Sequence, residues 1–170
     1  RQMCIRDRLQ GGFCMGRAIY VSSVNGDDAN SGYAPEKAFR SLKKVNQMEI
    51  QPGDQILLER GSVFVGEYLH LYRGGTKEAP VVVDAYGEGA LPRIETDGNG
   101  IWYQNYGGHL DNVVHTWKGY LSSAVLLYDA EYISIRNLEI TNNPCVKNER
   151  LNQADRMNRT GVSVIAKNHG

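Results

Sequence analysis

The stretch "AVLLYDAEYISIRNLEITNN", residues 124–143, holds three short apolar segments with brief polar segments between them. Alternate aliphatic side chains in each segment can face one side, which is the period of a half-buried β-strand. The aliphatic residues expected to face inward are Val125, Leu127, Ile133, Ile135, Leu138 and Ile140. Asn142 and Asn143 end the stretch and are expected to form a corner. The pattern predicts one turn of a parallel β-solenoid, with its three strands on three successive faces.

A second copy of the pattern begins at Gly161. Aligning Val162 with Val125 places the two copies 37 residues apart, which is one solenoid turn that carries an outward loop over residues 144–159. Because such a turn cannot bury its apolar side chains alone, stability requires several stacked turns.

The rest of the chain also reads mainly as short strands bounded by Gly, Pro, Asn or Asp. The other predicted strands cover residues 18–23, 55–59, 62–65, 67–72, 81–85 and 93–96. A single amphipathic helix is predicted from Glu36 to Gln47, with Phe39, Leu42, Val45 and Met48 on its apolar side. We expect this helix to cap the first turn of the solenoid, whose apolar end and strand edges would otherwise be exposed.

The segment before the helix gathers four oxygen-bearing side chains, those of Asn25, Asp27, Asp28 and Asn30. Such side chains can bind calcium, but the spacing does not follow the twelve-residue calcium loop, because Gly32 stands where a ligand is needed. The favoured interpretation is a structural turn that brings in the capping helix.

Composition limits the classes of function. Lysine plus arginine equals aspartate plus glutamate, 19 against 19, so there is no overall field to attract nucleic acid or an anionic membrane. No segment is apolar for long enough to span a bilayer. The three cysteines form no CxxC pair, and no metal site is predicted.

The two ends of the chain have unusual sequences. Residues 1–18 are predicted to be a leader, in which "RQMCIRDR" resembles translated sequencing-adapter DNA and Gly16 and Ala18 suit the remnant of a signal-peptidase site. Residues 19–170 are predicted to hold the N-terminal cap and the first solenoid turns, truncated at the C-terminus.

Several longer stretches carry a family resemblance. They are "IYVSSVNGDDANSGYAPEKAFRSLKKVN" (19–46), "QPGDQILLERGSVF" (51–64), "VVVDAYGEGALPRIE" (81–95) and "YISIRNLEITNN" (132–143). They resemble the N-terminal part of right-handed parallel β-helix proteins of the pectin-lyase-like superfamily. The resemblance implies an all-β, right-handed parallel β-helix in an exported protein, secreted, periplasmic or at the cell surface, that handles acidic or complex polysaccharide.

Two loops hold the candidate substrate-binding residues. These are Trp102, Tyr103, His115, Trp117 and Lys118 in residues 101–123, and Arg150 in residues 144–159. Aromatic rings can stack on sugars and cations can meet carboxylates. The alternatives are that the first loop fills its own small core and that the second is a solvated, self-paired loop.

The resemblance predicts a monomeric polysaccharide lyase or glycoside hydrolase whose catalytic residues lie in later turns. Calcium is a possible cofactor of a full-length lyase, and none is evident in this sequence. The alternative is a non-catalytic glycan-binding or adhesion module.

Overall fold

The computed structural model describes residues 16–105, 118–143 and 158–166, and most of its regular structure is β-strand. The strands of the first half are β1 (Ala18–Val21), β2 (Gln55–Glu59), β3 (Val63–Val65), β4 (Leu69–Leu71), β5 (Val81–Tyr86) and β6 (Arg93–Glu95). They are followed by β7 (Ile101–Asn105), β8 (Lys118–Tyr128), β9 (Ile133–Ile135), β10 (Glu139–Thr141) and β11 (Asn158–Ile165). The helices are a 3-10 turn, η1 (Pro35–Lys37), and α1 (Leu42–Asn46). The prediction of an all-β fold is confirmed.

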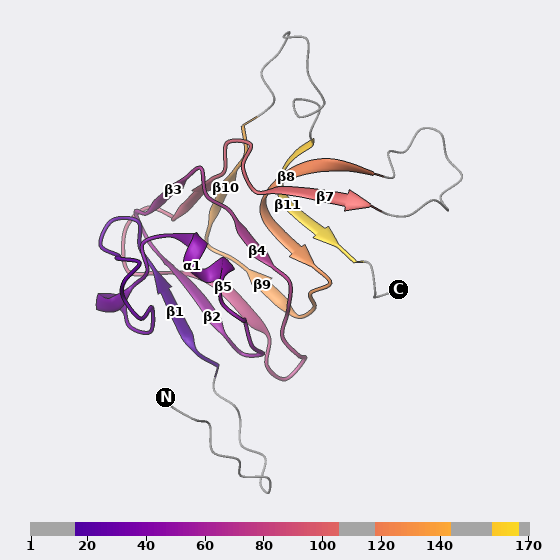
Figure 1. Cartoon of the computed structure of the whole chain (residues 1–170). Coiled ribbons are helices and arrows are strands. Elements are labelled where there is room, and N and C mark those ends of the chain that lie inside the picture. Colours follow the sequence, from indigo (N-terminus) through magenta and orange to yellow (C-terminus); the bar gives the residue numbers. More distant parts are fainter. Residues whose placement is uncertain (1–15, 106–117, 144–157, 167–170) are drawn as a thin grey trace, which may run out of the picture.

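The strands form three parallel sheets, and the chain passes from one sheet to the next in rotation (Figure 1). Strands β1, β2, β5 and β9 form the first sheet, β3, β6 and β10 the second, and β4, β8 and β11 the third. Val162 pairs with Val125, so the predicted register of the two repeat copies is confirmed. Asn142 follows β10, where the corner was predicted, and its side chain bonds Gly98, Ser122 and Thr160 from three other segments of the chain.

The core lies between the three sheets and is built by the two-residue period of the strands. The fully buried side chains on the inner faces include Ile19, Ile56, Val81, Phe64, Ile94, Leu69 and Val125. Burying such a side chain contributes about 1.5–3 kcal/mol. Ile133, Ile135, Leu138 and Ile140, predicted to face inward, pack against this core while remaining partly exposed.

The single capping helix predicted over Glu36 to Gln47 was wrong, because the chain is extended between η1 and α1. Phe39 forms a parallel bridge with Val21, and its backbone exchanges hydrogen bonds with Tyr20 and Ser22 on the edge of β1. This pairing covers an edge that would otherwise expose unpaired backbone groups. The predicted apolar side still points inward, since Phe39, Leu42 and Val45 are buried.

Residues 101–123 were predicted to be an insertion, and their described part forms an antiparallel pair. Strand β7 pairs with the first part of β8, and both project from the three sheets (Figure 1). Arg17 and Ala18, placed in the leader by the sequence analysis, belong to the fold, because Arg17 bonds Asp54 and Ala18 lies in β1. In the part of the chain that the structure describes, no helix is long and apolar enough to cross a membrane.

Candidate functional site

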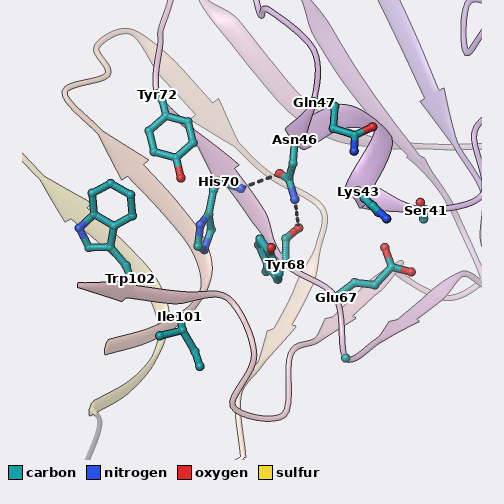
Figure 2. Close-up of a pocket in the computed structure, with 11 residues that line it drawn as sticks. Ser41, Lys43, Asn46, Gln47, Glu67, Tyr68, His70, Tyr72, Ile101 and Trp102 are labelled. Atoms are coloured by element: carbon teal, nitrogen blue, oxygen red, sulfur yellow. Dashed lines mark hydrogen bonds between the residues drawn. The ribbon is translucent and has the colours of Figure 1, made fainter. Parts of the chain in front are cut away.

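A groove of about 680 Å³ lies between α1, β4 and β7. Figure 2 shows its side chains, with aromatic rings from β4 and β7 on one side and polar groups from α1 on the other. The lining residues are Ser41, Lys43, Asn46, Gln47, Gly66, Glu67, Tyr68, His70, Tyr72, Ile101 and Trp102.

The alternation of β4 places three rings on this groove. Leu69 and Leu71 are buried in the core, so Tyr68, His70 and Tyr72 point to the outer face of the third sheet. Tyr68 packs on the His70 ring with a centroid distance of 4.5 Å.

Asn46 fixes α1 beside β4. Its side chain accepts a hydrogen bond from the His70 backbone N–H and donates one to the Tyr68 carbonyl, both at 2.9 Å (Figure 2). These are two backbone groups on the open edge of β4, which the amide of Asn46 satisfies as a neighbouring strand would.

Glu67 lies between β3 and β4, and its carboxylate reaches the start of α1. There it accepts a hydrogen bond of 2.6 Å from the Leu42 backbone N–H. Burial raises the pKa of this carboxyl, and the hydrogen bonds from Leu42 and Lys43 only partly oppose the shift. Asp28 adds a further raising influence through its negative charge. The groove therefore holds a carboxyl group that takes up a proton more readily than an exposed glutamate.

His70 is buried, and its Nε2 lies 3.1 Å from the Ser123 carbonyl oxygen. Because a carbonyl only accepts, Nε2 carries the ring proton in this contact and Nδ1 is left as an acceptor. Burial lowers the pKa of His70, although the bond to Ser123 opposes the shift. The imidazole is therefore neutral at pH 7 and serves as a hydrogen-bonding group.

Trp102 closes the aromatic side of the groove. Its ring centroid lies 4.9 Å from that of Tyr128 and 5.7 Å from that of Tyr72, in tilted arrangements. Its Nε1 donates a hydrogen bond of 3.0 Å to the side chain of Gln104 on the same face of β7. The indole is therefore held in place from two directions.

Of the predicted binding residues that the structure describes, Trp102 lines the groove, and Tyr103 and Lys118 do not. Tyr103 lies on the opposite face of β7 and packs against Tyr120 at 4.9 Å. Lys118 begins β8 and pairs with Asn105. The other three predicted residues, His115, Trp117 and Arg150, lie outside the described residues.

Sequence reasoning missed the contributions of Glu67, Tyr68, His70 and Tyr72 to the groove. The alternating sequence Tyr-Leu-His-Leu-Tyr over residues 68–72 was the available signal, because it places every ring of the strand on one face.

The four side chains considered for calcium form hydrogen bonds with other groups of the protein. Asp28 accepts hydrogen bonds from the Arg40 and Ser41 backbones at 2.9 Å, and Asn25 bonds Glu59. Asp27 accepts from Ala29, and Asn30 donates to Ala38. These contacts supply the structural role that the sequence analysis favoured. The described residues contain no cluster of three or more histidine, cysteine or acidic side chains suited to a metal ion.

Comparison with known proteins gives one consistent result. The chain is similar to lacto-N-biosidases. It is 38% identical over 177 residues to the lacto-N-biosidase of Bifidobacterium longum subsp. longum, a match that covers 90% of this chain and 11% of the relative. No protein-family model matches the sequence.

Solved structures agree with the sequence match. The selenomethionine derivative of the GH136 lacto-N-biosidase from Eubacterium ramulus is 55% identical, with a TM-score of 0.83 over 91% of this chain and 25% of that chain. The native crystal structure of that protein gives 52% identity and a TM-score of 0.77, over 86% of this chain and 23% of that chain. The chain thus spans a small part of these relatives.

These matches correct the assignment to the pectin-lyase-like superfamily. The similar proteins are lacto-N-biosidases, at identities of 38% to 55%, and the two solved structures among them are described as GH136. The membership expected from the residues of 19–46, 51–64, 81–95 and 132–143 was therefore wrong.

Proposed function

We propose that this chain is part of a glycoside hydrolase that acts on glycans in the manner of the lacto-N-biosidases, releasing the disaccharide lacto-N-biose. The observation that carries the proposal is the 55% identity and TM-score of 0.83 to the GH136 lacto-N-biosidase from Eubacterium ramulus. A lyase is not proposed, because the relatives that carry the argument are hydrolases.

The three parallel sheets support a finer proposal about the fold. Each passage of the chain through β2, β3 and β4, through β5, β6 and β8, and through β9, β10 and β11 adds one strand to each sheet. We propose that this winding is that of a parallel β-helix. The right-handed turn, an exported location and a monomeric state remain predictions, and so does calcium as a possible cofactor of the full-length protein.

The groove keeps the second candidate function open, because an aromatic wall beside polar groups also suits a glycan-binding module without catalysis. The two functions differ in their products. A hydrolase releases free lacto-N-biose and a new reducing end, whereas a binding module retains the glycan unchanged.

The test is incubation of the purified full-length protein that contains this chain with a glycan that ends in lacto-N-biose, followed by chromatographic analysis of the products. Release of lacto-N-biose is the expected result. Retention of the intact glycan without release would replace the hydrolase with the binding module. A protein that neither binds nor cleaves this glycan would overturn the proposal.

A further inference from the structure

We infer that the groove between α1, β4 and β7 binds a neutral saccharide ring, which stacks on the exposed aromatic side chains of Tyr72 and Trp102. The inference rests on the proposed function for its class of ligand and adds the place where the sugar binds. Its physical basis is the exposure, charge and hydrogen-bonding capacity of the groove.

The aromatic wall is not closed off as a core. Tyr72 is 47% exposed, Tyr68 is 37% exposed and Ile101 is 59% exposed. Trp102 is half-buried, held against Tyr72 and Tyr128 on one side while lining the groove on the other (Figure 2). Rigid aromatic surface of this kind offers apolar contact area at low cost in conformational entropy.

The charges in the groove favour a neutral ligand. Its lining holds one cation, Lys43, and one acid, Glu67. His70 also lines the groove, and its imidazole is uncharged at pH 7 because burial lowers its pKa. A site for a uronate would need an excess of cations, so the balance here favours an uncharged sugar.

The polar side can bond sugar hydroxyl groups in both directions. Gln47 is exposed and brings an amide that donates and accepts, and the Tyr72 hydroxyl can do the same. The groove of about 680 Å³ lies within the usual range of small-molecule sites, about 300–1,000 Å³, and has room for a disaccharide.

The experiment measures binding of free lacto-N-biose by saturation-transfer-difference NMR and calorimetry, with galacturonic acid as the charged comparison. The variants are Trp102→Ala and Tyr72→Ala. The matched control is Tyr103→Ala, because Tyr103 is the next residue of β7 and faces away from the groove. Melting temperatures identify any variant that fails to fold. If Trp102→Ala fails to fold, Tyr72→Ala still tests the groove, because the Tyr72 side chain is more exposed.

The expected result is that lacto-N-biose binds more tightly than galacturonic acid and that each groove variant weakens binding about three- to tenfold, the range of one aromatic contact. Tyr103→Ala is expected to bind as the parent does. Equal weakening by Tyr103→Ala, or tighter binding of the acid, would overturn the inference.

Failure of this inference is distinguishable from failure of the proposed function. Release of lacto-N-biose from a glycan, with binding unaffected by both groove variants, would overturn the groove assignment and leave the hydrolase standing. Groove-dependent binding without release would support the groove and favour the glycan-binding module. Absence of both binding and release would overturn both.

Discussion

Asp54 illustrates how one residue connects the start of the chain to the fold. Its side chain is 1% exposed and accepts hydrogen bonds from the backbone and guanidinium of Arg17 and from the Gln51 backbone. Burial alone would raise the pKa of Asp54, but these hydrogen bonds and the charge of Arg17 hold it below its usual value. The folded state therefore stabilises the ionised form.

We predict that Asp54→Asn lowers the free energy of unfolding at pH 7 by about 1.5–3 kcal/mol, the usual loss for hydrogen bonds to a charged group. Because the folded pKa is depressed, the contribution of Asp54 is complete above the unfolded pKa of about 4 and is lost as pH falls through the folded value. The variant should therefore lose less stability than the parent on acidification, as measured by urea unfolding at pH 7 and pH 3.

The matched control for Asp54→Asn is Glu49→Gln. Glu49 pairs with Arg73, and their side chains are 64% and 67% exposed. Exposed pairs contribute about 0–1 kcal/mol, so this variant should change little at either pH. Equal effects of the two substitutions would show that burial gives Asp54 no special role.

The position of β7 depends on close approach of the backbone at Gly100. Gly100 has a φ of 62°, and a Cβ there would overlap the Ser123 carbonyl oxygen and lie 2.9 Å from the Tyr68 Cβ. Only glycine combines this conformation with this contact. Gly100 therefore lets β7 start directly beside Tyr68, where Ile101 and Trp102 reach the groove.

We predict that Gly100→Ala destabilises the fold by more than Gly61→Ala and weakens saccharide binding as well. Gly61 has a similar φ of 84°, but nothing lies within 4 Å of an added Cβ. Gly61→Ala should therefore lower the free energy of unfolding only by the backbone strain, about 1–2 kcal/mol. Gly100→Ala should lower it further, because its Cβ also overlaps neighbouring atoms. Urea unfolding of both variants measures the difference, and equal losses would show that β7 can shift without cost.

The strands could be predicted from the sequence more fully than the helix. The pattern of aliphatic residues around Val125 predicted a strand, and the pattern around Val162 repeats it, so both the strands and their register could be predicted. The apolar residues from Phe39 to Met48 have the spacing of a helix. This spacing carries no information about the free edge of β1. Pairing of Phe39 with Val21 satisfies that edge and overrides the local pattern.

The groove was less predictable because it joins residues that are far apart in the sequence. Asn46, His70 and Trp102 come from three elements, and nothing local indicates that α1 lies beside β4 or that β7 lies near Tyr72. Trp102 was found because an aromatic residue in an insertion suggests sugar contact. Tyr103 suggested the same role with equal force, and only the pairing of β7 with β8 separates the two faces.

At the scale of the whole molecule, stability comes from columns of side chains that run across the paired strands of each sheet. Leu69, Val125 and Val162 occupy the same register position in β4, β8 and β11. Leu69 and Val125 are fully buried, whereas Val162 is 47% exposed. The burial of one residue in a column thus depends on the strands on either side of it.

We predict that Val125→Ala lowers the free energy of unfolding by about 2–3 kcal/mol, from lost transfer energy and a residual cavity. Val162→Ala should cost less than about 1 kcal/mol, although it removes the same two methyl groups from the same column of the same sheet. Because β8 lies in the middle of the sheet and β11 at its edge, the difference reports how completely each valine is packed. Urea unfolding of the two variants gives the comparison, and equal losses would show that contacts beyond the described residues bury Val162 in solution.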